Sequence, residues 1–211
     1  MSNLMQEIRQ AVIEGQAKTV VPKVEQALAD GVAPDVILNE SLISAMAEVG
    51  QLFEDSEFFV PEMLIAARAM SSALEILKPR LVEQGVEPIG KIAIGTVKGD
   101  LHDIGKSLVA MMLEGAGFEI VDLGVDVPAE KFIEAAQNGA KVVAMSALLT
   151  TTMPNMKKTI EAFREAGLRD QTVIMVGGAP VTQTYADEIG ADGYSPDASA
   201  AVRKAKELLG V

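Results

Sequence analysis

Apolar side chains recur with a helical period through the first part of the chain. Four such stretches cover residues 4–12, 20–28, 38–53 and 63–77. A spacing of three to four residues between apolar positions is typical of amphipathic helices. Gly31 and Gly85 suit helix ends, whereas Pro34 and Pro61 suit first helical turns. The pattern therefore predicts a four-helix bundle over residues 1–86.

The pattern changes after the connecting segment GVEPIG. Five short runs rich in β-branched and other apolar residues now alternate with stretches of helical composition: KIAIGTV, FEIVDLG, KVVAMSAL, TVIMVGG and GADGYS. The last run is the weakest strand candidate, but a clear helix candidate follows it. This alternation predicts an α/β domain with right-handed βαβ units and a parallel sheet. We expect residues 87–211 to form a Rossmann-type domain with the flavodoxin-like strand order 2-1-3-4-5.

Composition narrows the classes of partner. The 211 residues are 49% hydrophobic, enough to supply a packed core, and they include no cysteine, which excludes disulfides and thiolate metal sites. A formal net charge of -12 and a pI near 4.6 oppose binding to nucleic acid or to an anionic membrane surface. We find no apolar run long enough for a membrane span and no secretory signal, and therefore expect a cytoplasmic protein.

The unusual residues of the second half gather in three loops. They are KGDLHDIGKS after the first predicted strand, SALLTTTM after the third and GGAPVT after the fourth. In a parallel sheet of this order, ligands bind beyond the carboxyl ends of the strands, where the first and third strands diverge. All three loops end up at that edge, so we expect the functional site there.

The first of these loops carries His102, the single histidine of the chain, with Asp100 two residues before it. A neutral imidazole that donates Nδ1–H to a carboxylate presents Nε2 as an oriented metal ligand. Zinc normally needs further histidine or cysteine ligands, so a lone histidine suits a metal held in a macrocycle. Two alternatives stay open on spacing alone: the pair caps the following helix, or it acts in general acid–base catalysis, although no G-x-S-x-G motif accompanies it.

The same loop differs from a phosphate-binding P-loop. Five residues separate Gly99 from the Gly-Lys-Ser at residues 105–107, whereas a P-loop has four. The bulky Leu101 and Ile104 would crowd a triphosphate, and the two carboxylates of the loop would repel it. The composition of the loop therefore favours a cation over a nucleotide.

Residues of all three loops resemble the D-x-H-x-x-G, S-x-L and G-G signature of the B12-binding domain. The residues that carry the resemblance are Asp100, His102, Gly105, Ser146, Leu148, Gly177 and Gly178. The chain is similar to the cobalamin-binding module of cobalamin-dependent methionine synthase and to the small corrinoid proteins of methanol, methylamine and methoxyarene methyltransferase systems. The segment VGQLFEDSEFFVPEML is similar to the helical cap of those proteins. The resemblance covers nearly the whole chain, with a cap over residues 1–86 and a cofactor domain over 87–211.

The resemblance implies a bound cobalamin in the base-off form, whose benzimidazole tail leaves the cobalt and enters a slot in the sheet domain. It makes His102 the cobalt ligand, with Asp100 and Thr152 continuing a hydrogen-bond relay from the imidazole. The other cofactor-binding residues that it implies in the sheet domain are Gly99, Asp103, Ile104, Gly105, Ser146, Leu148, Thr150, Gly177, Gly178, Ala179, Gly193, Tyr194 and Ala198. In the helical half they are Phe53, Val60 and Met63. Taken singly, each has an ordinary alternative as a turn, cap or core residue.

The implied function is that of a methyl carrier. Cobalamin, as methylcobalamin or another corrinoid, would take a methyl group on cobalt from a substrate-specific methyltransferase and deliver it to an acceptor methyltransferase, with a reductive activase as a further partner. The protein alone is then not a complete enzyme, and the methyl donor is specified by the partner. The alternatives are a B12-dependent sensor, a mutase small subunit, a stand-alone methionine synthase and a flavodoxin-like signalling domain without B12.

Overall fold

The structure is a computed structural model that describes residues 3–211. The chain divides into two compact units. The first extends to Pro88 and includes Glu114–Gly117, and the second comprises Ile89–Leu113 and Phe118–Val211. Within residues 3–211, none of the helices combines the length and the apolar character that a membrane span requires.

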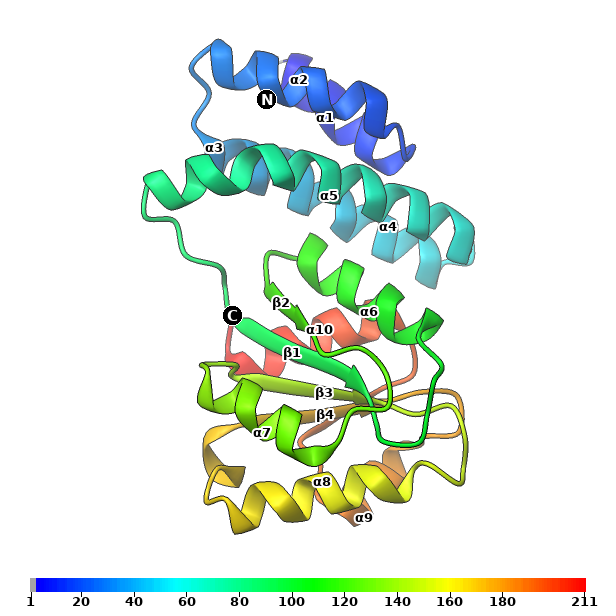
Figure 1. The fold of residues 1–211 in the computed structure, drawn as a ribbon. Coiled ribbons are helices and arrows are strands. Elements are labelled where there is room, and N and C mark those ends of the chain that lie inside the picture. The colour runs from blue at the N-terminus through cyan, green and yellow to red at the C-terminus, as the bar shows by residue number, and fades with distance from the viewer. Residues whose placement is uncertain (1–2) are drawn as a thin grey trace. The chain divides into compact units, whose positions relative to one another are not determined.

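The first unit is built from helices. They are α1 (Asn3–Ile13), α2 (Ala17–Ala29), α3 (Pro34–Val36), η1 (Ile37–Ile43), α4 (Ser44–Glu54) and α5 (Val60–Glu83) (Figure 1). Because α3, η1 and α4 follow one another directly, the unit has four helical stretches, and the prediction of a helical amino-terminal region is confirmed. Pro34 and Pro61 lie in first helical turns, where a missing N–H costs nothing. The π-helical segment η1 was not foreseen, because its apolar residues keep a spacing that an α-helix also allows.

Apolar packing holds these helices together. Helix α2 packs against both α1 and α5, and Ile8, Val24 and Leu77 are fully buried. Gly31 and Gly85 follow α2 and α5 with φ of +82° and +69°, a left-handed conformation that ends a helix at little cost only in glycine.

The second unit contains a five-stranded parallel sheet. Its strands are β1 (Lys91–Thr96), β2 (Glu119–Asp122), β3 (Val142–Ser146), β4 (Val173–Gly177) and β5 (Gly193–Ser195). The strand order is β2-β1-β3-β4-β5, with every neighbouring pair parallel. The predicted flavodoxin-like order is therefore confirmed.

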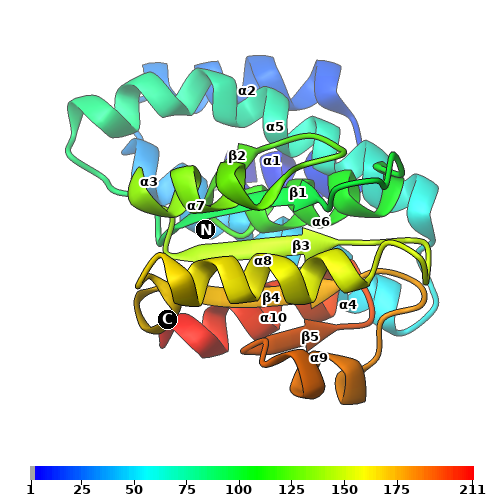
Figure 2. The same cartoon turned by 60° about the horizontal axis from the view of Figure 1, so that its bottom comes forward.

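Helices cover both faces of the sheet. They are α6 (Ile104–Gly115), α7 (Ala129–Gln137), α8 (Pro154–Glu165), the short η2 (Arg169–Gln171), α9 (Gln183–Ile189) and α10 (Ala198–Leu209). Figures 1 and 2 show α7, α8 and α9 on one face and α6 and α10 on the other. On the first face Phe132 and Phe163 are fully buried against Val143 and Ile174. This apolar layer fixes the strands that carry the loops after β1, β3 and β4. We call these three the rim loops.

Four strands end on one row of the sheet. Thr96 is in register with Ser146, Ser146 with Gly177, and Gly177 with Ser195. Side chains in register on parallel strands point to the same face of a sheet. The loops that follow these residues therefore leave the sheet at one level and meet at its carboxyl edge.

Candidate functional site

The loop after β1 folds back over the end of its own strand. Asp100 N donates to Val97 O at 3.1 Å, and Gly99 between them has φ of +84°, which strongly favours glycine. Thr96 Oγ1 then donates to His102 O at 2.8 Å. These bonds hold His102 at the edge of the sheet, directly before α6.

Asp100 orients the His102 ring. Asp100 Oδ1 lies 2.7 Å from His102 Nδ1 and also accepts from His102 N at 3.1 Å. The Asp100 side chain has no exposed surface, whereas the His102 side chain is 50% exposed. With Nδ1–H donated to the carboxylate, the neutral ring keeps the lone pair of Nε2 for a ligand. The geometry thus allows the metal-ligand role that the sequence suggested.

The second oxygen of Asp100 is bound by the loop after β3. Asp100 Oδ2 accepts from Thr152 Oγ1 at 2.6 Å, from Leu148 N at 2.8 Å and from Leu149 N at 3.3 Å. Burial by itself would raise the pKa of Asp100, but the hydrogen bonds from Thr152, Leu148 and His102 outweigh it and hold the pKa well below its usual range. Asp100 is therefore a carboxylate at neutral pH, and the structure brings Asp100, His102 and Thr152 together as the resemblance implied.

Two side chains that sequence analysis missed hold Thr152 in place. Tyr185 in α9 donates its hydroxyl to Met153 O at 2.7 Å. Asn155 Nδ2 donates to Lys98 O at 2.7 Å and so ties the loop after β3 to the loop after β1. Burial, with a smaller contribution from the charge of Glu188, raises the pKa of Tyr185. Local sequence could not have revealed these bonds, because their partners lie 32 and 57 positions apart.

The loop after β2 also supports the histidine loop and was likewise missed. Asp126 Oδ1 accepts from Gly99 N at 2.6 Å, and Asp126 N donates to Asp100 O at 2.9 Å. Asp126 has φ of +54°, a strained value for a residue with a side chain. Nearby, the buried Lys106 donates to Asp122 Oδ1 at 2.6 Å. The two hydrogen bonds of Asp126 and the ion pair hold the loop against the site despite this strain.

Glycines at the rim allow close backbone approach. Gly178 has φ of +125°, and a Cβ there would lie 1.9 Å from Ala147 O. A Cβ at Gly177 would lie 3.2 Å from Ser195 O. Gly105, in contrast, has no atom within 4 Å of a built Cβ and lies in the first turn of α6. Gly178 is thus required by the fold itself, whereas the fold gives no reason for Gly105.

Exposed aliphatic side chains belong to the two loops that hold His102 and Asp100. Leu101 is 70% exposed, Ile104 75%, Leu148 42% and Leu149 41%. Large exposed aliphatic side chains clustered in one place mark a surface for a ligand or partner. Ile104 and Leu148 were predicted as cofactor-binding residues, whereas their neighbours Leu101 and Leu149 were not. A broad, flat ligand centred on His102 fits this surface better than a small ion does.

The remaining candidate residues differ in their surroundings. Asp103, Thr150 and Ala179 are exposed in the rim loops, and Ala198 is buried at the start of α10. Gly193 and Tyr194 both belong to β5: the former is packed below α10, because a Cβ there would lie 2.9 Å from Leu208 Cδ1, and the latter packs against the core of the opposite face. Their contact with a cofactor stays a prediction.

The three candidates of the helical unit are also placed differently. Phe53 lies near the end of α4 and is half-buried, and Val60 begins α5 with 38% of its surface exposed. Met63, one turn further on, has no exposed surface. Burial therefore argues against direct contact between Met63 and a ligand, whereas the exposed Val60 is accessible to one. Ligand contact by all three residues stays a prediction.

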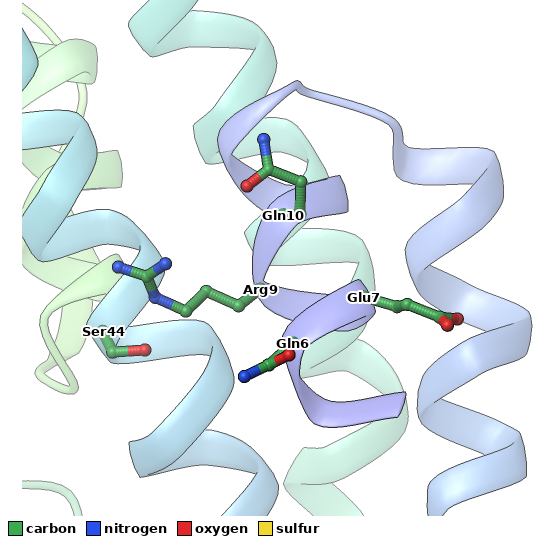
Figure 3. Close-up of a pocket in the computed structure, with 5 residues that line it drawn as sticks. All are labelled: Gln6, Glu7, Arg9, Gln10 and Ser44. Atoms are coloured by element: carbon green, nitrogen blue, oxygen red, sulfur yellow. The ribbon is translucent and has the colours of Figure 1, made fainter. Parts of the chain in front are cut away.

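A hollow on the surface of the helical unit lacks the features of a cofactor site. Figure 3 shows the residues that line it, which are Gln6, Glu7, Arg9, Gln10 and Ser44. Its charged side chains are already paired, Arg9 with Glu48 and Glu7 with Lys23. None of the predicted cofactor-binding residues lines it. Its polar side chains are those of an ordinary solvated helix surface.

Metal binding at the rim would depend on His102 alone. Over residues 3–211, His, Cys, Asp and Glu side chains form no group of three or more that could hold a metal ion. The half-exposed imidazole, its carboxylate partner and the aliphatic surface therefore suit a metal whose other ligands come from a macrocycle. These residues fit a corrinoid, which has that construction.

Comparison with known proteins agrees with this chemistry. Residues 90–203 match the family described as "B12 binding domain", and residues 4–78 match a second family of the same description. Dimethylamine corrinoid protein 3 of Methanosarcina acetivorans is 45% identical over 210 residues, covering 99% of this chain and 98% of that protein. Trimethylamine corrinoid protein 1 of the same organism is 43% identical over 204 residues, covering 95% and 94%.

A solved structure is similar over the same length. The methanol:cobalamin methyltransferase complex of Methanosarcina barkeri contains a chain with a TM-score of 0.88 and 29% identity, matched over 99% of this chain and 80% of that one. A cobalamin-binding protein of Desulfitobacterium hafniense matches with a TM-score of 0.79 and 29% identity, over 98% of each chain. The expected family is thus confirmed, and the chain belongs to the B12-binding corrinoid proteins of methyltransferase systems.

Proposed function

We propose that this protein holds base-off cobalamin, with His102 as the protein ligand to cobalt, and carries a methyl group from a methylamine-specific methyltransferase to an acceptor methyltransferase. The observation that carries the proposal is the hydrogen-bonded series from Thr152 through Asp100 to His102 at the carboxyl edge of the sheet. A lone imidazole oriented in this way, within an aliphatic surface, is the ligand that a cobalt macrocycle lacks.

Each residue has a distinct task in this proposal. Bound cobalamin supplies a cobalt centre that can accept a methyl group and give it up. His102 presents Nε2 to that centre, and Asp100 fixes the tautomer and direction of the ring. Thr152 stabilises the charged Asp100 and thereby keeps the proton on His102 Nδ1. The exposed Leu101 and Ile104 would offer apolar contact to the macrocycle.

The methyl donor that we propose is a methylamine, with dimethylamine first. Support comes from the relatives named dimethylamine corrinoid protein, which are 43% to 46% identical to this chain over nearly their full length. The partner is then a methyltransferase specific for that amine, and a reductive activase restores the cofactor after oxidation. Residues 1–86 would act as the cap and 87–211 as the cofactor domain, in line with the two family matches at 4–78 and 90–203.

Cofactor binding tests the first part of the proposal. Titration of the apoprotein with cobalamin should give one bound equivalent and a base-off spectrum that His102→Ala changes. Lys158→Ala, an exposed site on α8, is the control and should bind as the wild type does. Since His102 is the one histidine, protein labelled with ¹⁵N-histidine should convert the nitrogen splitting of the cobalt(II) EPR signal from a triplet to a doublet. An unchanged triplet would show that the cofactor keeps its own base on cobalt.

Donor specificity tests the second part. The loaded protein, reduced chemically to the cobalt(I) state, is incubated with a dimethylamine methyltransferase and dimethylamine, and with a methanol methyltransferase and methanol. The spectrum reports methylation of the cofactor. We expect methylation in the first mixture. Methylation in the methanol mixture alone would contradict the proposed donor while leaving the cofactor site intact.

A further inference from the structure

Ser195, the last residue of β5, has a hydroxyl that the fold does not use. The residue is 8% exposed. Among the buried side-chain polar atoms of residues 3–211, Ser195 Oγ is the one without a hydrogen-bond partner. A buried hydroxyl lost from water and left unpaired lowers stability, so native proteins keep such groups chiefly where a ligand or water completes them.

Its position on the sheet shows where the hydroxyl faces. Gly193, two residues earlier on the same strand, faces α10, because a Cβ there would lie 2.9 Å from Leu208 Cδ1. Side chains two apart on a strand share a face, so Ser195 also faces the α10 side of the sheet. Ser195 ends β5, three residues before α10 begins at Ala198.

The neighbours of Ser195 form a row with a gap. Ser195 is in register with Gly177, and Gly177 with Ser146, so the two serine side chains point to the same face on either side of a residue without a side chain. A Cβ at Gly177 would come within 3.2 Å of Ser195 O and would narrow that gap. The row thus places two hydroxyls on either side of a position without a side chain, at the carboxyl edge of the sheet.

We infer that Ser195 Oγ forms a hydrogen bond to a polar group of the nucleotide tail of bound cobalamin. The inference rests on the proposed function, and the family resemblance counts Ser146 and Gly177, the neighbours of Ser195 in the row, among the cofactor-binding residues. The tail carries ribose hydroxyls, a phosphate and a ring nitrogen, any of which can pair with a serine hydroxyl. Ser195 lies outside the D-x-H-x-x-G, S-x-L and G-G motifs, so the motifs did not point to it.

Two ligands that differ only in the nucleotide tail show whether Ser195 contacts the tail or another part of the cofactor. Cobalamin has the nucleotide tail, whereas cobinamide has the same corrin ring without it. Ser195→Ala should bind cobalamin about tenfold more weakly than the wild type, the effect of one lost hydrogen bond, and should bind cobinamide equally well. The matched control is Ser72→Ala, because the Ser72 hydroxyl donates within its own helix to Arg68 O at 3.0 Å.

Thermal unfolding of the apoprotein gives a second readout. Ser195→Ala should leave the apoprotein as stable as the wild type or more stable, because it removes an unpaired buried hydroxyl. Equal losses of affinity for cobalamin and cobinamide, or an unchanged affinity for cobalamin, would overturn the inference and leave the proposed function standing. Failure of the wild-type protein to bind cobalamin would overturn both.

Discussion

Thr152 Oγ1 donates a 2.6 Å hydrogen bond to Asp100 Oδ2 across 52 positions of sequence. The two oxygens of this buried carboxylate face different loops. Oδ2 accepts from the loop after β3, and Oδ1 accepts from His102 Nδ1 at 2.7 Å. Thr152 therefore acts on the imidazole only through Asp100. Substitutions of Thr152 or Asp100 should disturb the buried hydrogen bonds of the network, whereas substitution of His102 removes the exposed ligand itself.

Asp100→Asn should destabilise the apoprotein strongly. An amide has the shape of the carboxylate, but its NH2 group must face either the donors of the loop after β3 or those of His102, and it brings no charge. Loss of charge-assisted bonds from a buried site should lower the free energy of unfolding by about 3 kcal/mol, measured in urea. The exposed neighbour Asp103 provides the control, and Asp103→Asn should stay within about 0.5 kcal/mol of wild type. Equal stability of the two variants would contradict the assignment of Asp100 as the centre of the network.

Two substitutions at Thr152 test the contributions of its hydroxyl and its methyl group separately. Thr152→Val keeps the shape and is more apolar, but it removes a donor from a buried charge and should cost about 2 kcal/mol of unfolding free energy. Thr152→Ser keeps the donor, loses one methyl group and should cost below about 1 kcal/mol. Hydrophobicity alone predicts the opposite order. Urea unfolding of both apoproteins decides, and a valine variant more stable than the serine variant would show that the bond to Asp100 contributes little.

From spacing alone, the sequence could join only residues close to one another in the chain, whereas the link from Asp100 to Thr152 came from the family resemblance. The pairing of Asp100 with His102 follows from a two-residue spacing in one loop. The parallel sheet follows from the alternation of apolar runs, and its strand order was predicted because it is the commonest for five such strands. Asp126 was missed because its bond to Gly99 spans 27 positions and exists only once β1 and β2 are in register. The unpaired hydroxyl of Ser195 could not be foreseen at all, since the lack of a partner is a property of the folded chain.

Asp126 combines a hydrogen bond with backbone strain, and three substitutions separate the two. Asp126→Asn keeps an acceptor for Gly99 N and tolerates a positive φ, so it should stay within about 0.5 kcal/mol of wild type. Asp126→Gly loses the acceptor but relieves the strain and should cost about 1 kcal/mol. Asp126→Ala loses the acceptor and keeps the strain, for a cost of about 2 kcal/mol. Chemical unfolding of the apoproteins should give this order, and a glycine variant less stable than the alanine variant would refute the strain argument.

Tyr185 should produce a pH dependence of stability. Burial, and then the charge of Glu188, raise its pKa above the unfolded value of about 10. The folded state therefore holds the phenol proton more tightly than the unfolded state does. The contribution of Tyr185 is complete below the unfolded pKa and is lost as the pH rises through the raised folded pKa. The stability difference between wild type and Tyr185→Phe, about 1 kcal/mol at neutral pH, should shrink above about pH 10.

The titration of Tyr185 can be observed directly. The chain has two tyrosines and no tryptophan, so in Tyr194→Phe the tyrosinate absorbance reports Tyr185 alone. Its midpoint should lie above that of a free tyrosine and should fall when Glu188→Gln is added, because one nearby negative charge is gone. A midpoint at or below the ordinary value would contradict burial of the phenol against Met153.

Substitutions at two rim glycines should affect different properties, Gly178→Ala the stability of the fold and Gly105→Ala the binding of the cofactor. Gly178→Ala places a Cβ 1.9 Å from Ala147 O on a backbone with φ of +125°, so the apoprotein should lose about 3 kcal/mol or more. Gly105→Ala meets no atom within 4 Å and replaces a glycine in the first turn of α6, so the apoprotein should keep or gain up to about 1 kcal/mol.

Cobalamin titration completes the comparison. If the cofactor tail passes beside the backbone at Gly105, the added methyl group should weaken cobalamin binding by Gly105→Ala about tenfold or more while the apoprotein remains stable. Cobinamide, which lacks the tail, should bind nearly as it does to the wild type. A Gly105→Ala variant that binds both ligands normally would show that the tail does not run along the start of α6, and the open space beside Gly105 would then have no part in the site.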